Sequence, residues 1–268
     1  MKNLSLKTFL STAALLCGTM AFAVEPAGSG GEAAPSVENS STYRIEAGAG
    51  SILETYLSPL KYHGLSMALS GSWRHALQGS KTVEMTFDGS IEGFITRSPA
   101  KNANMYLGSI SFDWGVRRLW RAGTNWRLGI GGGPRLDAGV IYEPRNGNNP
   151  AAAKCAVAAE ISAFGSYSFN WLGKRLTVAD DVRLPSASIF FSQQYGESYY
   201  EIYRGNHSGL VHFGWWGNNF CIDNLLSIEI PMKKGALTAG YHFKIRSSYI
   251  CDINTQAVSH AFVVGWKF

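Results

Sequence analysis

Three places in this 268-residue chain carry residue types that could do chemistry. Asp180–Asp181 could activate a water molecule, as paired carboxylates do in general acid–base catalysis. His207–Ser208 and Ser259–His260 could each supply the base and the hydroxyl nucleophile of an acyl hydrolase. Neighbouring side chains project to opposite faces of a strand, so the value of each hypothesis depends on the secondary structure around it.

The elements around these residues are predicted to be strands with one apolar and one polar face. Between residues 82 and 96, Val83, Met85 and Phe87 alternate with Glu84 and Asp88. Acidic side chains at every second position cannot face an apolar core, but they can face a wet lumen. The same alternation predicts ten strands, at 42–53, 63–77, 82–96, 104–118, 125–141, 153–169, 175–190, 219–231, 235–248 and 255–268.

Segment 175–190 fits this pattern least well. Asp180 falls among the apolar side chains of its face, and Pro185 interrupts the ladder. A β-bulge near Asp180–Asp181 would restore the alternation. A polar, aromatic stretch follows from 192 to 209, and two more membrane strands within 185–218 would raise the count to twelve.

A tight turn at Lys233–Lys234 fixes a register for the hairpin around it. Residues whose numbers sum to 467 then pair, so Asp223 faces Lys244 on the polar side and Leu226 faces Tyr241 on the apolar side. In this register polar residues pair with polar ones and apolar residues with apolar ones, which supports it.

The predicted fold class is all-β, a transmembrane antiparallel up-and-down barrel of about ten strands, with twelve as the alternative. The last strand carries a row typical of a barrel-assembly signal, Phe262, Val264, Trp266 and Phe268. Connections on the side of Phe268 are short, near 79–81, 121–124, 170–174 and 232–235. The other, extracellular side is predicted to hold longer ones, at 54–62, 97–103, 142–152, 191–218 and 249–254.

Composition and the N-terminus agree with an exported membrane barrel. The chain is 46% hydrophobic and 16% charged, and beyond the N-terminus it has no apolar run long enough for a membrane helix. Residues 1–23 read as a signal peptide cleaved after Ala23, 24–40 as a flexible periplasmic leader and 41–268 as the barrel. Cleavage removes two lysines, so the formal charge of +5 falls to +3, which argues against a nucleic-acid partner.

Neither a metal nor a cofactor is expected. The cysteines left after cleavage, Cys155, Cys221 and Cys251, have no metal-ligand spacing. A Cys221–Cys251 bridge and three unpaired, half-buried thiols remain alternatives. The Gly129–Gly133 run lacks the spacing of a phosphate-binding loop, so small lumen-facing residues that let the barrel bend are the better interpretation.

The polar faces predict a network of charges inside the lumen. A ten-stranded barrel is only a little wider than its side chains can fill, so opposed charges are expected to close it as a plug, with a narrow pore as the alternative. The predicted network comprises Glu84, Asp88, Glu92, Asp113, Arg117, Arg127, Arg135, Asp137, Glu160, Asp223, Lys244 and Arg246. The same face also carries Arg74, Glu229, His242 and Lys267.

The longest predicted extracellular loop supplies candidates for ligand or partner binding. Aromatic rings interleaved with hydrogen-bonding groups can stack on sugars or grip a protein, although an aromatic belt or a self-packed loop has the same composition. The candidates are Tyr199, Tyr200, Glu201, Tyr203, Arg204, Asn206 and His207.

A family resemblance rests on the C-terminal strand and on three further segments: 145–150 (RNGNNP), 195–206 (YGESYYEIYRGN) and 209–213 (GLVHF). With them the chain resembles an uncharacterised family of Bacteroides-type outer-membrane β-barrels, a domain of unknown function. The resemblance implies an exported barrel of the bacterial outer membrane, and it implies no catalytic or ligand-binding residue.

The sequence thus favours a non-enzymatic outer-membrane barrel with a charge-plugged lumen, whose extracellular loops bind a ligand or partner or serve the envelope structurally. Outer-membrane lipid and the barrel-assembly machinery are the other expected partners. One alternative is a hydrolase at the extracellular rim, either a lipase or deacylase or an omptin-like protease. Against it, His207–Ser208 would face apart in a strand, Asp180–Asp181 falls within the span beside Arg183, and His260 falls on the outward face near the rim. A narrow pore is the second alternative.

Overall fold

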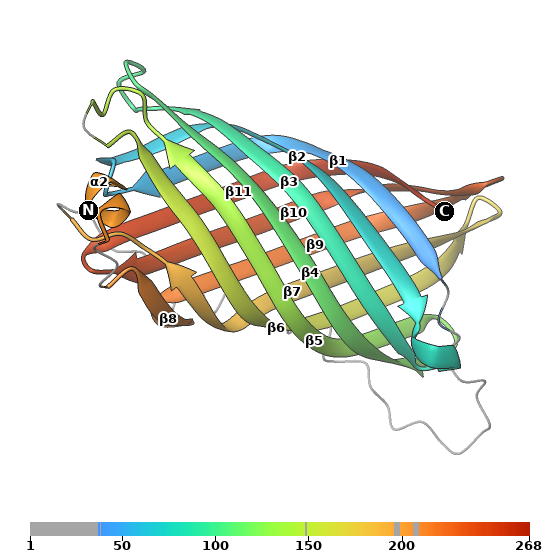
Figure 1. Ribbon diagram of the computed structural model, residues 1–268. Coiled ribbons are helices and arrows are strands. Elements are labelled where there is room, and N and C mark those ends of the chain that lie inside the picture. The colour runs from blue at the N-terminus through green and yellow to red at the C-terminus, as the bar shows by residue number, and fades with distance from the viewer. Residues whose placement is uncertain (1–36, 38, 148, 196–198, 206–208) are drawn as a thin grey trace.

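The structure is a computed structural model that describes residues 37, 39–147, 149–195, 199–205 and 209–268. One antiparallel sheet closes on itself into a barrel, because β6 pairs with both β5 and β7 (Figure 1). The ring consists of β1 (Ser40–Glu54), β2 (Ser58–Ala76), β3 (Val83–Arg97), β4 (Asn104–Ala122), β5 (Trp126–Tyr142), β6 (Ala151–Trp171), β7 (Lys174–Phe191), β9 (Asn219–Met232), β10 (Gly235–Ile250) and β11 (Ile253–Lys267). The predicted fold class of a ten-stranded barrel is confirmed.

Side-chain alternation explains why these segments close as they do. On β3, Ile91 is 64% exposed on the outer face, whereas Glu92 beside it is 4% exposed inside the lumen. The same reversal of soluble-protein patterning recurs around the ring, with apolar groups outside and carboxylates inside. Closure also gives every ring strand a hydrogen-bonded neighbour on each side, which suits an apolar surrounding.

The predicted hairpin register is also confirmed. In the β9–β10 ladder, Asp223 pairs with Lys244 and Leu226 pairs with Tyr241. The first and last strands close the ring beside this hairpin, from Thr42 opposite Lys267 to Glu54 opposite Thr255.

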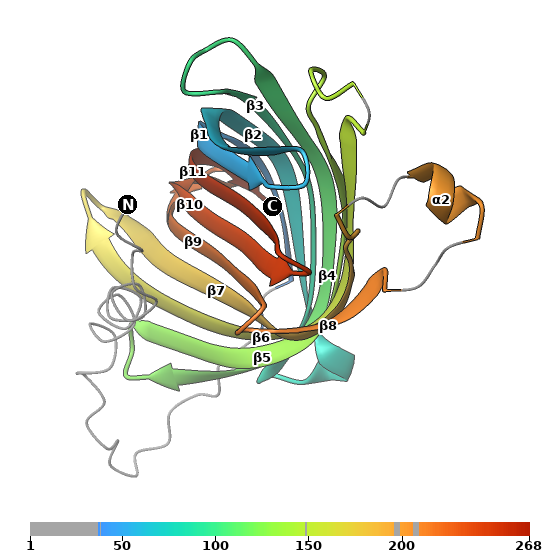
Figure 2. The same cartoon turned by 90° about the vertical axis from the view of Figure 1, so that its left-hand side faces the viewer.

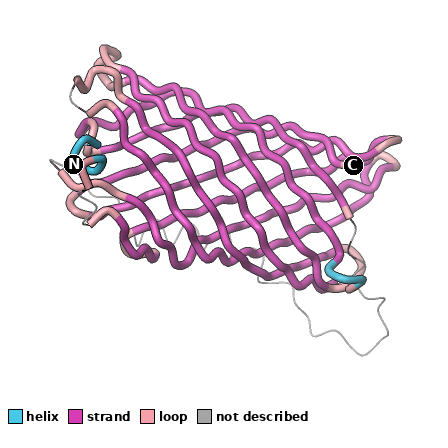
Figure 3. Tube along the Cα trace, viewed as in Figure 1, coloured by secondary structure: helices cyan, strands magenta, loops and turns pink. Residues whose placement is uncertain are grey.

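The barrel has two ends, which we call the terminal end and the loop end. The terminal end holds Ser40 and Phe268 together with the connections 77–82, 123–125, 172–173 and 233–234. A short 3-10 helix, η1 (Leu77–Gly79), lies within the first of these. The loop end holds the connections 55–57, 98–103, 143–150, 192–210 and 251–252, and Figure 3 shows helical turns only at the two ends of the strands.

The predicted difference in connection length was wrong at two loop-end sites. β2 begins at Ser58, so only residues 55–57 connect it to β1, and β10 and β11 meet in a tight turn at 251–252. Ser58–Lys61 was predicted to be a break, but the buried side chains of Leu57 and Tyr62 pack into the lumen and draw this segment into the barrel wall.

The predicted bulge near Asp180–Asp181 was also wrong. Both residues pair regularly with Gly165 and Phe164, and the irregularity lies at Ser186, next to Pro185. Proline has no backbone N–H to donate, so the ladder is interrupted there rather than at the acids. Asp181 therefore faces the lumen, while Asp180 faces outward and accepts a hydrogen bond of 2.5 Å from the Asn224 amide.

The described part of the polar stretch after β7 forms no additional pair of ring strands. It contains a one-turn helix, α2 (Tyr199–Tyr203), which lies outside the ring at the loop end (Figure 2). A five-residue strand, β8 (Val211–Trp215), pairs with the loop-end part of β7 at 187–191, and β9 pairs with β7 at 177–183. Trp216 bridges the junction by donating a hydrogen bond of 2.8 Å from Nε1 to the carbonyl oxygen of Pro185. Among the described residues, no helix has the length and apolar character needed to cross a membrane.

Close approach of strands makes Gly133 on β5 sensitive to substitution. A Cβ at this position would overlap the carbonyl oxygen of Trp114, whereas a Cβ at Gly108 on β4 meets nothing within 4 Å. We expect Gly133→Ala to destabilise the barrel by about 1–3 kcal/mol, the usual range for overpacking, and Gly108→Ala to be neutral. The stability of both variants can be measured by urea unfolding in micelles, with heat-modifiable gel migration as the readout. Equal stability of the two variants would contradict the tight packing at Gly133.

Candidate functional site in the barrel lumen

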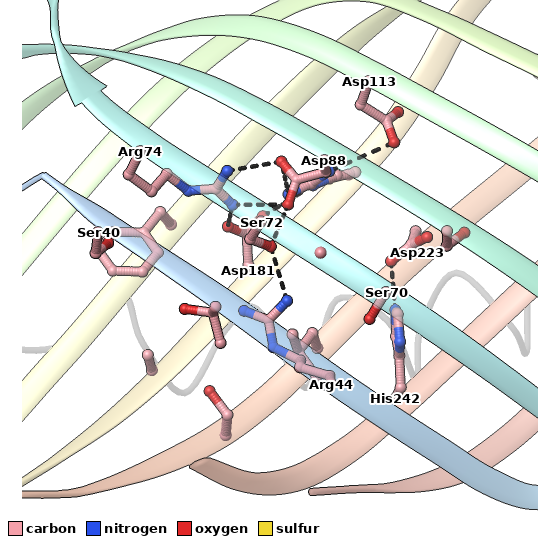
Figure 4. A pocket seen from close by; sticks show the side chains of 18 of the residues that line it. Ser40, Arg44, Ser70, Ser72, Arg74, Asp88, Asp113, Asp181, Asp223 and His242 are labelled. Atoms are coloured by element: carbon pink, nitrogen blue, oxygen red, sulfur yellow. Dashed lines mark hydrogen bonds and ion pairs between the residues drawn. The ribbon is translucent and has the colours of Figure 1, made fainter. Parts of the chain in front are cut away.

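The lumen holds a connected set of buried ion pairs, which we call the lumen charge network. In its first part, Asp181 accepts from Arg117 at 2.9 Å and from Arg183 at 3.3 Å, and it lies 3.7 Å from Arg74. Asp88 in turn binds Arg74 at 2.7 Å (Figure 4), and it also binds Arg183 at 2.8 Å. Strands β2, β3, β4 and β7 supply these side chains, so the pairs tie opposite parts of the wall together.

The second part of the network centres on β10. Glu92 binds Arg246 at 2.6 Å and Lys244 at 3.4 Å, and Lys244 also reaches Glu46 at 3.1 Å. His242 lies between two carboxylates, 2.8 Å from Glu46 and 2.6 Å from Asp223. These contacts connect β1, β3, β9 and β10.

Arg135 on β5 joins the two parts. Its guanidinium lies 3.2 Å from Asp113, which also contacts Arg183 at 3.6 Å, and 3.8 Å from Asp223. Glu160 and Asp137 complete its shell at 3.3 and 2.8 Å. A buried charge without a partner costs several kcal/mol in lost hydration, so this continuous pairing is what permits so many charges in one lumen.

An apolar layer closes the lumen nearer the loop end. Its residues lie in or beside the strand segments next to the loop end, and they are almost fully buried. They are Ile52, Leu57, Tyr62, Phe94, Met105, Leu107, Ile141, Ala152 and Ala257. The predicted plug consisted of charges alone, and the inward-facing Phe94, Met105 and Leu107 were the sequence signal for this layer.

A polar cavity, here called the vestibule, occupies the lumen toward the terminal end (Figure 4). It contains about 120 Å³ of space for the centre of a water molecule, several times what one water needs. Its wall runs from the lumen charge network to Ser40 and Lys267 at the ends of β1 and β11. Hydroxyl groups contribute much of the wall, from Ser40, Thr42, Ser70, Ser72, Ser90, Ser111 and Ser227.

Most members of the predicted network make the ion pairs just described. Arg117 additionally contacts Glu84 at 3.5 Å. Arg127 differs, since it makes no ion pair among the described residues and lies over the Phe164 ring at 5.7 Å. The prediction left out Glu46, which contacts His242 and Lys244. It also left out Asp181 and Arg183, because Pro185 and the outward Asp180 obscured the parity of β7.

The loop-end candidates are only partly described. Tyr200 and Tyr203 on α2 are 68% and 86% exposed, and Glu201 and Arg204 are also exposed. Tyr199 belongs to the same helix, but its side chain, like all of Asn206 and His207, lies outside the described residues. Tyr195 donates a hydrogen bond of 3.0 Å to the carbonyl oxygen of Thr55 and so docks this loop on the β1–β2 turn.

The candidate hydrolytic pairs do not converge. Asp180 and Asp181 lie on opposite sides of the wall. Ser259 points inward with its hydroxyl 3.4 Å from Glu92, whereas His260 points outward and contacts the Tyr241 hydroxyl at 2.5 Å. The predicted position of His260 near the rim was wrong, since it lies midway along β11, opposite Ala49. His207 and Ser208 fall outside the described residues.

The remaining predictions concern the last strand, the cysteines, a metal site and the N-terminal segments. Phe262, Val264 and Phe268 are exposed on the outer face of the last strand and its end, and their role in assembly stays a prediction. Cys155, Cys221 and Cys251 are free thiols. In the described part of the chain, no group of three or more His, Cys, Asp or Glu side chains is placed to hold a metal ion. The predicted signal peptide and nearly all of the leader lie outside the described residues.

Fold and lumen together define a closed β-barrel of the outer-membrane type. The chain belongs to a family described as "Protein of unknown function (DUF3316)", whose model matches residues 8–267. No curated protein matches the chain. The narrower Bacteroides-type assignment stays a prediction.

Three solved structures resemble this chain at low identity. The outer membrane protease OmpT from Escherichia coli matches with a TM-score of 0.56 and 10% identity, over 90% of this chain and 99% of that one. The transport unit of the autotransporter AIDA-I from Escherichia coli gives 0.42 and 9%, over 97% of each chain. An outer membrane channel from Pseudomonas putida F1 gives 0.41 and 10%, over 91% and 99%. The last two likenesses are too loose to support an argument.

Glu92 provides a test of the lumen charge network. Its replacement by Gln leaves Lys244 and Arg246 short of a buried counter-charge, and removal of one partner from such a pair costs about 3–5 kcal/mol. The matched control is Glu229→Gln, because the Glu229–Lys267 pair is partly exposed at 2.8 Å and is expected to contribute at most about 1 kcal/mol. Chemical unfolding in micelles measures both variants, and a Glu92→Gln cost no larger than that of the control would count against the network.

Proposed function

We propose that this protein is a non-enzymatic barrel of the bacterial outer membrane that holds its lumen closed and acts through binding at its ends. The observation that carries the proposal is the continuous ion pairing across the lumen together with the apolar layer beyond it. An ion crossing the barrel would have to break buried pairs and then pass uncharged side chains, and both steps cost several kcal/mol.

The outer membrane is the proposed location, and the fold supports it. The ring of strands presents Ile45, Leu69, Ile91, Ile110 and Val264 outward, each more than half exposed, so the wall suits an apolar solvent. In the proposed orientation, the terminal end faces the periplasm, where Phe268 would be read by the assembly machinery. The loop end then faces outward.

Binding at the loop end is proposed to involve α2 and its neighbours. Tyr200 and Tyr203 offer exposed rings, and Glu201 and Arg204 offer charged hydrogen-bonding groups on the same turn. Rings beside such groups suit the stacking and hydrogen bonding by which proteins recognise sugars or partner surfaces. Tyr199, Asn206 and His207 extend this proposed site in sequence.

The likeness to OmpT does not favour proteolysis. At 10% identity it shows the fold alone. Asp180 and Asp181, the acids that suggested such chemistry, lie on opposite faces of β7 and cannot share one water molecule.

Conductance tests the closed lumen. Purified protein in a planar bilayer is expected to carry no steady current, because the ion pairs and the apolar layer block the path. A porin reconstituted in the same way serves as the positive control. Reproducible unit steps from this protein would overturn the closed-barrel proposal.

Cys251 tests the orientation. It is exposed in the β10–β11 turn at the loop end, while Cys221 faces the lumen wall and Cys155 lies on the outer face of β6. A membrane-impermeant maleimide is expected to label Cys251 in intact cells, and Cys251→Ser should abolish that labelling. If labelling requires the outer membrane to be permeabilised, then the proposed orientation or location is wrong.

A further inference from the structure

Two arginines in the vestibule differ from the other lumen arginines. Arg74, Arg117, Arg135, Arg183 and Arg246 each contact at least one carboxylate. Arg44 and Arg127 contact none among the described residues. Arg44 donates one hydrogen bond of 2.7 Å to the Ser72 hydroxyl, and Arg127 has only the face of Phe164.

The Nε donors of both arginines have no acceptor among the described residues. Nε of Arg44, Arg117 and Arg127 is buried in each case without a hydrogen-bond partner in the described part of the chain. A buried guanidinium donor that lacks an acceptor is costly, so this geometry calls for an acceptor from outside the protein. All three arginines line the vestibule.

Local charge favours an anion as that acceptor. Seven Arg and Lys side chains line the vestibule against six Asp and Glu side chains, before His242 is counted. Each of the six carboxylates already has a basic partner in the lumen, including Glu229, which binds Lys267 at 2.8 Å. Within the described chain, Arg44 and Arg127 are therefore the vestibule arginines without a carboxylate in direct contact, and Arg44 reaches Asp88 only through the Ser72 hydroxyl.

We propose that the vestibule binds a small phosphate-type oxyanion between Arg44 and Arg127. The two residues come from β1 and β5, which stand nearly across the ring from each other. A phosphate-type oxyanion presents oxygens in several directions and carries about −1.5 to −2 charge near pH 7, so it can accept from both walls and match two guanidinium groups better than a singly charged carboxylate. The hydroxyl group of Ser227 can donate a further hydrogen bond to it. The limited space suits inorganic phosphate or the head of a phosphomonoester.

The apolar layer makes the vestibule a blind site. A ligand can enter from the terminal end, past Ser40 and Lys267, but the layer of Phe94 and Met105 separates it from the loop end. The proposed function bears on this inference only through the orientation, which makes the periplasm the source of the ligand. Phosphate binding to purified protein is measured independently of orientation and conductance, so failure of one proposal can be distinguished from failure of the other.

Calorimetric titration of the purified, folded barrel with inorganic phosphate tests the site. We expect saturable binding of one phosphate, weakened about tenfold or more in Arg44→Gln and in Arg127→Gln, because each loses a charge-assisted hydrogen bond. Arg118→Gln is the matched control, since it removes the same charge from an exposed arginine outside the vestibule and should bind as the wild type does. Equal affinity in all three variants, or no saturable binding, would overturn the proposal.

A measurement on the unmodified protein covers the case in which a variant does not fold. An arginine-specific dicarbonyl reagent, followed by mass spectrometry, should modify Arg44 and Arg127 less when phosphate or glycerol phosphate is present. Acetate at equal concentration should protect less. No protection by either phosphate compound, or equal protection by acetate, contradicts the phosphate-type site.

Discussion

The neutrality of a closed lumen is the constraint on which the rest of this structure depends. Side-chain alternation sends every second residue inward, and a charge buried there is costly unless an opposite charge lies beside it. Asp181 illustrates the result, since arginines from β2, β4 and β7 surround it. The same pairs that neutralise the charges also hold distant parts of the wall together, so barrel closure and lumen electrostatics are one problem.

Strand parity was enough to predict the fold and most inward residues. Acids at every second position of β3, and agreement of both faces of the β9–β10 hairpin, left few alternatives to a barrel with that register. β7 was harder, because Asp180 faces outward beside Asn224 and Pro185 interrupts the ladder. The alternation within one strand shows which of its faces is polar. It does not show that a residue on a neighbouring strand, here Asn224, can bind a polar side chain on the apolar face.

The partners within the lumen could not be predicted, for a geometric reason. Asp223 pairs with Lys244 in the ladder, yet its close contact is His242, while Lys244 reaches Glu46 on β1 and Glu92 on β3. Long side chains in a tilted, staggered barrel cross the lumen instead of meeting their ladder neighbours. Connection lengths were misjudged for a related reason, since Leu57 and Tyr62 belong to the lumen packing although their segment resembles a turn.

Division of the lumen into an apolar layer and a polar vestibule gives the two ends different physical properties. Near the loop end, closure depends on dispersion and exclusion of water, which favour no particular solute. Toward the terminal end, closure depends on charges, and charges can be left over. If the lumen were only a plug, its arginines and carboxylates would be expected to saturate one another throughout. Arg44 and Arg127 are the exceptions, and both lie at the polar end, where a solute can reach them. This accessible position indicates a binding site and not a defect in packing.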